Sequence, residues 1–298
     1  MEQKPKIIVI VGMTATGKSD LAVRLAKRSN GEVVSADSRQ VFRGLDLGTG
    51  KISKREMRGI PHHLLDVADP KRPYSVAHFQ KAGRKVIADI LKRQKLPIIA
   101  GGTGFYIDAL VYEMNFPSVR PDMRLRKTLE RLATEKLVKR LETLDPKRLE
   151  TIDTKNRVRL IRAIEIATLY GPVQRLTKKT PYDILWIGLR TDNADLKSRI
   201  EKRLKKRIRA GMLKEFARLH AAGLSFRRME ELGLEYRYGA RLLQGELSRS
   251  EFEKELAKEI RRYAKRQMTW FKKNPDIHWL TPENVSSADA LVQKFLDS

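Results

Sequence analysis

The residues with the clearest chemical signature are the eight from Gly12 to Ser19, which read GMTATGKS and match the phosphate-loop pattern G-x-x-x-x-G-K-[ST]. Glycines let backbone N–H groups turn inward around phosphate oxygens, and the start of a following helix adds a favourable dipole. Lys18 brings a positive charge, and the Ser19 hydroxyl is a ligand that suits Mg²⁺. The loop predicts a phosphorylated substrate without saying which one. The residues that we expect at the phosphates are Gly12, Thr14, Ala15, Thr16, Gly17, Lys18 and Ser19.

Asp37 directly follows an expected strand, residues 33–36. It should therefore lie at the carboxyl edge of the sheet, where open α/β proteins place their ligands. A carboxylate that faces phosphates is electrostatically unfavourable unless Mg²⁺ or a proton-bearing nucleophile lies between them. Asp37 is thus a candidate general base or hydrogen-bond acceptor, and an Asx turn after the strand is the structural alternative.

Thr103 lies in a Gly-Gly-Thr-Gly segment after another expected strand, residues 97–100. A threonine here serves as a helix N-cap or as a hydroxyl of the site, and the two roles are compatible. An ATP-splitting enzyme needs a strand that ends in an Asp to support Mg²⁺. Because this strand ends without a carboxylate, the sequence disfavours a kinase.

The elements that position these residues are short apolar strands that alternate with amphipathic helices. This alternation predicts an α/β fold, a P-loop NTPase-like parallel sheet flanked by helices. Ser75 is the expected N-cap of the second helix. The expected strands are 7–11, 33–36, 97–100 and 184–189, and the expected helices are 18–29 and 76–93.

The pattern changes between residues 116 and 182 to charged, helical segments, which we interpret as an all-helical insertion domain between two core strands. The expected core is residues 1–115 and 183–298. The chain from about residue 192 also looks helical, and it includes two basic segments, 197–209 and 258–273.

The net charge points to a polyanionic partner. The chain has 62 Lys and Arg against 36 Asp and Glu, a formal charge of +26, yet its 41% hydrophobic residues suffice for a core. Such an excess favours nucleic acid first and an anionic membrane second. No apolar run approaches the roughly 20 residues of a membrane span, and the absence of cysteine excludes disulfides and cysteine zinc sites. We expect a cytoplasmic protein without membrane contact.

Taken together, the order and spacing of several motifs resemble one family, the bacterial-type tRNA dimethylallyltransferases (tRNA isopentenyltransferases). The resemblance covers most of the chain. It implies transfer of a dimethylallyl group from dimethylallyl diphosphate to the exocyclic amine of the adenosine just 3′ of a tRNA anticodon. The matching segments are 12–19, 37–51, 61–66, 101–106, 159–165 and 262–270.

The resemblance also implies roles for single residues. The phosphate loop would hold the diphosphate leaving group, with Mg²⁺ on Ser19, and Asp37 would orient the adenine amine and take its proton. Thr103 would contact the diphosphate. Arg203 resembles a family arginine that reaches the diphosphate, although Arg199 and Arg207 are local competitors.

The anticodon stem-loop of tRNA is the implied partner, and the helical insertion would swing over it. The family usually has an aromatic residue where this chain has Leu234, and Asn-Asp where it has Asn156-Arg157, so tRNA preference is in question more than chemistry. We expect a monomer. The residues implied at the RNA are Asp37, Ser38, Arg39, Gln40, Arg124, Arg159, Arg162, Arg262, Lys265, Arg266 and Gln267.

Two other functions compete with this interpretation. A small P-loop kinase for a nucleoside or metabolite would consume ATP and would not need a basic exterior. An RNA-binding protein with a vestigial nucleotide site would bind tRNA and catalyse nothing.

Overall fold

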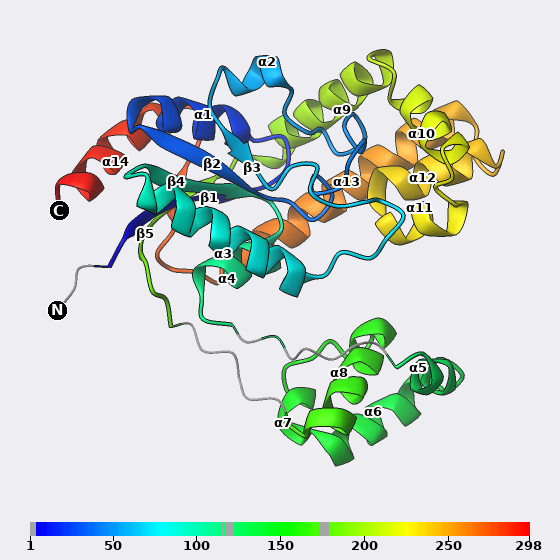
Figure 1. Ribbon diagram of the computed structural model, residues 1–298. Helices are drawn as coiled ribbons and strands as arrows, with labels where there is room; N and C mark the ends of the chain where they lie inside the picture. The colour runs from blue at the N-terminus through cyan, green and yellow to red at the C-terminus, as the bar shows by residue number, and fades with distance from the viewer. Residues whose placement is uncertain (1–3, 115, 117–121, 173–178) are drawn as a thin grey trace. The chain divides into compact units, whose positions relative to one another are not determined.

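The structure of the protein, a computed structural model, describes residues 4–114, 116, 122–172 and 179–298 (Figure 1). The chain forms two compact units, one of Met1–Tyr112 with Thr180–Ser298 and the other of Glu113–Lys179. The insertion expected at residues 116–182 overlaps the second unit, and residue 115, at its expected edge, lies outside the described residues. Each unit is described by itself.

A parallel sheet of six strands forms the centre of the first unit, in the order β3-β2-β4-β1-β5-β6. The expected α/β class is confirmed. The edge strands β3 and β6 are not among the expected strands, because two or three residues are too few to show a period. The strands are β1 (Lys6–Gly12), β2 (Gly31–Ala36), β3 (His62–His63), β4 (Leu96–Gly101), β5 (Asp183–Leu189) and β6 (His278–Leu280).

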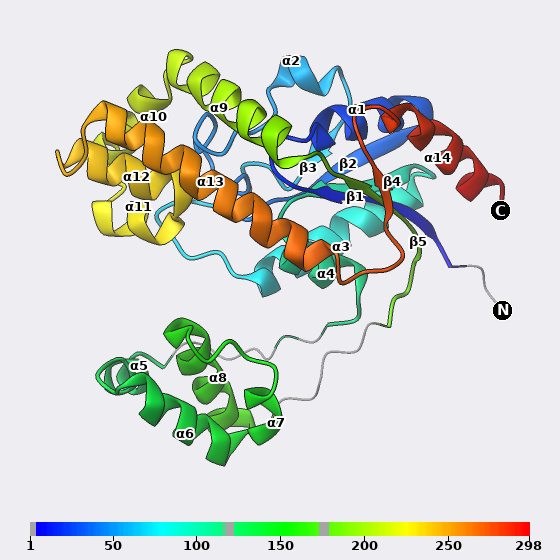
Figure 2. The ribbon, with the colours of Figure 1, turned by 180° about the vertical axis from the view of Figure 1, so that it is seen from behind.

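Both faces of the sheet are buried, which explains the continuous apolar runs of its strands. Helices α3 and α4 cover one face of the sheet, and α1 and α14 cover the other (Figures 1 and 2). Alternate residues of β1 enter two separate cores, Val9 with side chains of α3 and α4 and Ile8 with side chains of α1 and α14. Ser75 caps α3 as expected, since its hydroxyl accepts the N–H of His78. These helices are α1 (Lys18–Arg28), α3 (Val76–Lys92), α4 (Gly104–Val111) and α14 (Ala288–Asp297).

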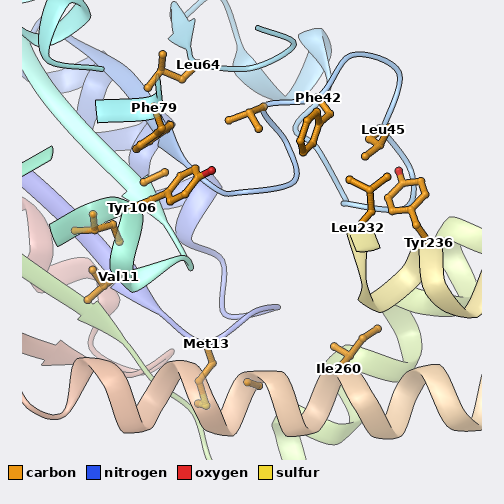
Figure 3. Close-up of a cluster of buried hydrophobic side chains, with 14 of the residues drawn as sticks. Val11, Met13, Phe42, Leu45, Leu64, Phe79, Tyr106, Leu232, Tyr236 and Ile260 are labelled. Carbon is orange, nitrogen blue, oxygen red and sulfur yellow. The ribbon is translucent and has the colours of Figure 1, made fainter. Parts of the chain in front are cut away.

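Five helices continue the chain after β5 and share the first core with the sheet. Figure 3 shows this continuity, because Phe79 and Tyr106 belong to the same cluster as Leu232 and Tyr236. Segment 41–45 joins the two parts of the cluster through Phe42. These helices are α9 (Asn193–Arg209), α10 (Met212–Ala221), α11 (Phe226–Leu232), α12 (Leu234–Leu243) and α13 (Arg249–Phe271), and the short α2 (Lys54–Met57) lies earlier in the chain.

The second unit is helical and has its own apolar core, which includes Leu137, Leu141 and Leu160. The fully buried carboxylate of Glu165 accepts hydrogen bonds from the guanidinium of Arg126 at 2.8 and 2.9 Å and thereby joins α5 to α8. No helix in the described part of the chain is long and apolar enough to cross a membrane. The helices of this unit are α5 (Met123–Glu130), α6 (Thr134–Leu144), α7 (Pro146–Leu149) and α8 (Arg157–Tyr170).

Candidate active site at the phosphate-binding loop

The phosphate loop connects β1 to α1, as its sequence predicts. Gly12 and Gly17 have φ angles of 137° and 90°, which favour glycine, and Ala15 also lies in the left-handed region at 63°. A Cβ at Gly12 would overlap the carbonyl oxygen of Leu189 on the neighbouring strand. Gly12 therefore lets the loop leave the sheet. Gly17 is the N-cap of α1 and has no side chain to cap the helix, so the first N–H groups of α1 are available for an anion.

A cavity of about 550 Å³ opens at the loop. Of the residues expected at the phosphates, all except Gly12 line it. The remaining walls come from the carboxyl ends of β2 and β4, from the loop before α2, and from α9, α12 and α13. Those other lining residues include Asp37, Arg39, Gln40, Thr49, Gly50, Gly101, Gly102, Arg199, Lys202, Arg203, Lys206, Leu234, Glu235, Tyr263 and Gln267.

Lys18 lies in this cavity, and its Nζ donates a hydrogen bond to the carbonyl oxygen of Met13 at 2.6 Å. Burial, and then the positive charge of Arg203, lower the pKa of Lys18 to about 7, although the negative charge of Asp37 opposes both effects. An ammonium group with a lowered pKa becomes fully charged when an anion approaches, so the site is built to receive negative charge.

Asp37 forms the Asx turn that was the structural alternative, and this turn uses only one of its two carboxylate oxygens. Its Oδ1 accepts the N–H groups of Arg39 at 2.8 Å and Gln40 at 3.2 Å, which makes an Asx turn. Its Oδ2 accepts no hydrogen bond from the described residues, and Asp37 lines the cavity. One oxygen thus builds the turn while the other can accept a proton from a ligand.

Thr103 occupies the N-cap position of α4, but its hydroxyl does not cap the helix. Instead, its Oγ1 accepts the N–H of Ser38 at 3.1 Å. Gly101 and Gly102 line the cavity, whereas Thr103 is not among the lining residues. Its hydroxyl joins the ends of β2 and β4, next to the predicted phosphate site.

Three arginines of α9 competed for a place at the diphosphate, and the structure separates them. Arg199 lines the cavity but forms an ion pair with Asp195 at 2.6 Å. Arg207 donates from Nη1 to the carbonyl oxygen of Gly48 and does not line the cavity. Arg203 lines the cavity and forms no ion pair in the described part of the chain; burial, and then the charge of Arg207, lower its pKa. Arg203 is therefore the arginine with a charge free for a ligand.

Gln267 was expected at the RNA, but its side chain is used inside the protein. It is buried, its Oε1 accepts the N–H of Thr14 at 2.8 Å, and its Nε2 donates to the carbonyl oxygen of Gly102 at 2.9 Å. Its spacing of three from the buried Ala264 and four from the buried Phe271 places it on the inner face of α13, a signal that was available in the sequence.

The other cations expected at RNA lie at the surface or in ion pairs. Arg262 and Arg266 are each about 60% exposed, and both pair with Glu259. Lys265 is exposed on the same helix. In the helical unit, Arg124 and Arg159 are exposed, whereas Arg162 pairs with the buried Glu165 at 3.1 Å.

The expected magnesium ion has few protein ligands available. The described residues contain no cluster of three or more His, Asp, Glu or Cys side chains that could hold a metal alone. The cavity lining does include the hydroxyl of Ser19, the residue expected at the metal. One hydroxyl fits Mg²⁺ bound with a diphosphate, because Mg²⁺ usually takes one or two protein ligands together with phosphate oxygens and waters.

Comparison with known proteins identifies the family of the chain. A sequence model of the family described as IPP transferase matches residues 40–274. The chain is 42% identical to tRNA dimethylallyltransferase 2 of Citrifermentans bemidjiense over 97% of this chain and 95% of that protein. It is 39% identical to tRNA dimethylallyltransferase of Pelotomaculum thermopropionicum, over 98% of this chain and 96% of that one.

Solved structures give the same result. The tRNA isopentenylpyrophosphate transferase of Bacillus halodurans is 35% identical, with a TM-score of 0.75 over 99% of this chain and 97% of that one. A eukaryotic dimethylallyltransferase, captured acting on tRNA, is 25% identical, with a TM-score of 0.81 over 97% of this chain and 77% of that one. The protein with the cavity described above therefore belongs to the IPP transferase family, that of the tRNA dimethylallyltransferases.

Proposed function

We propose that this protein transfers a dimethylallyl group from dimethylallyl diphosphate to the exocyclic amine of the adenosine 3′-adjacent to a tRNA anticodon, with release of diphosphate. The single observation that carries the proposal is one cavity that is lined both by the phosphate loop and by Asp37, whose carboxylate uses only Oδ1 in the turn. That arrangement gives a leaving group and a proton acceptor to one reaction. The names of its relatives support the choice of substrates.

The phosphate loop stabilises the leaving group. When the bond between the allylic carbon and the bridging oxygen breaks, negative charge grows on the diphosphate. Lys18, the loop N–H groups and Arg203 neutralise this charge, and Thr103 holds the neighbouring backbone that faces it. Mg²⁺, bound through the Ser19 hydroxyl and the diphosphate oxygens, would supply further neutralisation.

Asp37 serves the nucleophile. The adenine amine is a weak nucleophile because its lone pair is delocalised into the ring, so an acceptor that orients it and takes its proton accelerates attack. Oδ2 of Asp37 fills this role, while Oδ1 stays in the turn that holds the carboxylate in place. In the balanced step, the new bond joins the amine nitrogen to the allylic carbon, the carbon–oxygen bond breaks, and the proton goes to Asp37.

The exposed cations hold the RNA. A target adenine in a stacked loop must leave the stack to reach an enclosed site, and this costs a few kcal/mol. Contacts elsewhere on the stem-loop must offset that cost. We assign phosphate contacts to Arg262, Lys265 and Arg266 on α13 and to Arg124 and Arg159 on the helical unit, because these cations are exposed. We assign Ser38, Arg39 and Gln40 to the adenosine and its neighbours, because they adjoin Asp37.

We also propose that the protein acts as a monomer in the cytoplasm. The residues to which we assign the chemistry, which are the phosphate loop, Asp37 and Arg203, meet in one cavity within a single chain. Light scattering at the concentration used for the assay checks the mass. If light scattering shows a dimer, and activity falls as dilution dissociates it, the proposal of an active monomer is wrong.

The test of the main proposal uses an anticodon stem-loop with adenosine at the target position, labelled dimethylallyl diphosphate and Mg²⁺. Label should appear in the RNA, and a stem-loop with guanosine at that position should remain unlabelled. A parallel reaction with labelled ATP tests the kinase. If the RNA stays unlabelled while ATP is split or its phosphate transferred, the prenyltransferase proposal fails; RNA binding without any transfer favours the vestigial-site protein.

A further inference from the structure

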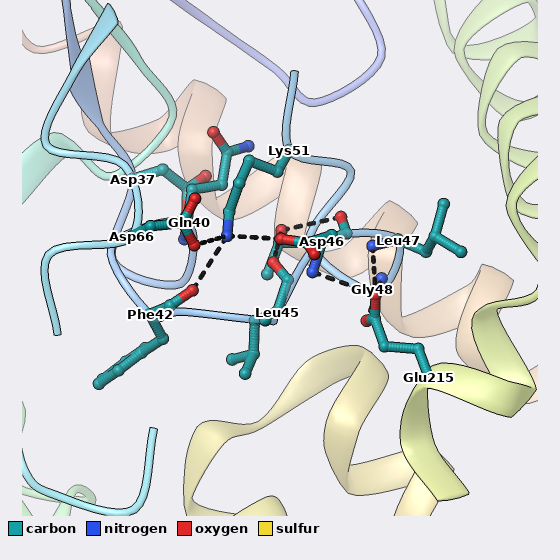
Figure 4. Close-up of polar contacts among 12 residues, drawn as sticks. Asp37, Gln40, Phe42, Leu45, Asp46, Leu47, Gly48, Lys51, Asp66 and Glu215 are labelled. Atoms are coloured by element: carbon teal, nitrogen blue, oxygen red, sulfur yellow. Dashed lines mark hydrogen bonds and ion pairs between the residues drawn. The ribbon is translucent and has the colours of Figure 1, made fainter. Parts of the chain in front are cut away.

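The loop of residues 42–51 forms one wall of the cavity through Thr49 and Gly50. One polar cluster closes this loop at its ends (Figure 4). The Lys51 side chain is only 5% exposed, and its Nζ donates to Asp46 at 2.7 Å, to Asp66 at 2.5 Å and to the carbonyl oxygen of Phe42 at 3.0 Å. The loop is therefore an ordered wall with its ends tied together.

A second cluster holds the middle of the same loop from behind. Glu215 on α10 is buried, and its carboxylate accepts the N–H groups of three consecutive residues, Asp46 at 3.2 Å, Leu47 at 2.7 Å and Gly48 at 3.0 Å (Figure 4). It also accepts the hydroxyl of Tyr236 at 2.8 Å. Four donors satisfy a buried carboxylate that would otherwise be very unfavourable.

The carbonyl groups of the loop point to the arginines of α9. Gly48 accepts Arg207 at 2.7 Å, and Gly50 accepts Nη2 of Arg203 at 3.0 Å. Glycine is favoured at both places, because a Cβ at Gly48 would meet the Tyr236 hydroxyl at 2.6 Å and Gly50 has a φ of 62°, where a Cβ would also displace the guanidinium of Arg203. The loop thus links a carboxylate outside the cavity to a cation inside it.

From this chain of contacts we propose that Glu215 is a positioning residue for diphosphate binding. By fixing the backbone of residues 46–48, it places the Gly50 carbonyl that holds Arg203 against the cavity. Glu215 does not itself line the cavity. The inference rests on the proposed function for the identity of the substrate, but the coupling between Glu215 and Arg203 concerns the binding of a diphosphate and is testable by itself.

The test measures the binding of magnesium pyrophosphate by calorimetry in four proteins: the unmodified protein, Glu215→Gln, Arg203→Ala and the double variant. A glutamine offers one acceptor oxygen and directs an NH₂ group at a backbone N–H. We expect Glu215→Gln to weaken pyrophosphate binding roughly tenfold. In the Arg203→Ala background, the same change should weaken binding less than about twofold, because the group that Glu215 positions is gone.

Two further variants distinguish positioning from a general loss of stability. Glu32→Gln alters another buried glutamate of the same unit, which pairs with Lys95 and does not line the cavity. It should lower the melting temperature and leave pyrophosphate binding unchanged. Glu215→Asp keeps the charge but shortens its reach, so it should reproduce the loss in binding even where Glu215→Gln folds poorly.

The inference is overturned if Glu215→Gln and Glu215→Asp both bind pyrophosphate as the unmodified protein does. It is also overturned if the loss is the same with and without Arg203. Failure of the proposed function would look different, because the unmodified protein would then leave the RNA unlabelled whatever the four affinities are.

Discussion

The cavity and the outer face of α13 are both rich in cations, but the cations of the two regions differ in exposure and in their hydrogen-bond partners. Lys18 and Arg203 lie in the cavity wall, bind backbone carbonyls, and form no ion pair within the described chain. Arg262 and Arg266 are about 60% exposed and share Glu259. Cations held in a buried site by neutral partners keep their full attraction for a small anion. Exposed cations are screened by salt and act together on an extended anion. The excess of +26 therefore serves two purposes that variants can separate.

The largest expected effect comes from removing Asp37, the cavity residue that we propose as the proton acceptor. Asp37→Ala should lower turnover by roughly 10²–10⁴-fold, the usual contribution of a general base. Pyrophosphate affinity should change little, because Asp37 serves the amine. Single-turnover experiments measure the rate of transfer, and calorimetry measures pyrophosphate affinity. Equal losses in both would mean that Asp37 supports Mg²⁺ instead.

Removing the buried ammonium group should affect the small anion alone. Lys18→Met is expected to lower kcat/KM for dimethylallyl diphosphate by about 10²–10³-fold, since a preorganised charge at the leaving group is removed. Affinity for the stem-loop should stay within about twofold, because Lys18 does not face the exposed surface. Lys27→Met, on the exposed side of α1, is the matched control and should retain activity. A parallel loss of RNA binding would show that the cavity and the outer face of α13 do not act separately.

The titration of Lys18 should make diphosphate binding in the cavity depend on pH. Its pKa of about 7 in the empty site must rise when a diphosphate binds, because the bound anion favours the charged form. Affinity for magnesium pyrophosphate should therefore fall by up to about tenfold per pH unit as the pH rises above 7, and this group adds no dependence below it. Lys18→Arg keeps a permanent charge and corrects for titration of the ligand. Identical pH profiles for the two proteins would contradict the prediction.

The smallest effect is expected at the surface. Arg262→Ala with Arg266→Ala should weaken stem-loop binding several-fold and reduce the slope of log affinity against log salt by about 0.7–0.9 for each RNA phosphate that the arginines no longer neutralise. Pyrophosphate affinity should not change. Arg249→Ala, at the start of the same helix and paired with Glu253, is the control. An unchanged salt slope would remove these two arginines from the RNA interface.

Local patterns in the sequence were sufficient to predict the centre of the molecule. Four of its strands are apolar runs buried on both faces, and the phosphate loop lies between β1 and α1, as the pattern requires. Asp37 could be placed at the sheet edge because the carboxyl ends of parallel strands share that edge.

The contacts that the sequence did not predict join segments that are far apart along the chain. Glu215 meets Leu47, 168 residues away, and no periodic pattern marks such a pair. The hydrogen bond between Gln267 and Thr14, which lies 253 residues earlier, was also not predicted; the resemblance implied only an RNA contact for Gln267, and that contact stays a prediction. The choice among the α9 arginines also depended on the loop carbonyls, which only the tertiary structure brings near.

Through Gln267, helix α13 also connects its exposed arginines to the phosphate loop. The helix has 23 residues, so it is a rigid rod of roughly 35 Å that carries Arg262 and Arg266 on one side and the Gln267 amide on the other. That amide holds the N–H of Thr14 and the carbonyl of Gly102 together. An RNA contact that tilts α13 would therefore strain these two hydrogen bonds, and a diphosphate that orders the phosphate loop would restrain the helix. RNA binding and diphosphate binding are thus coupled through α13.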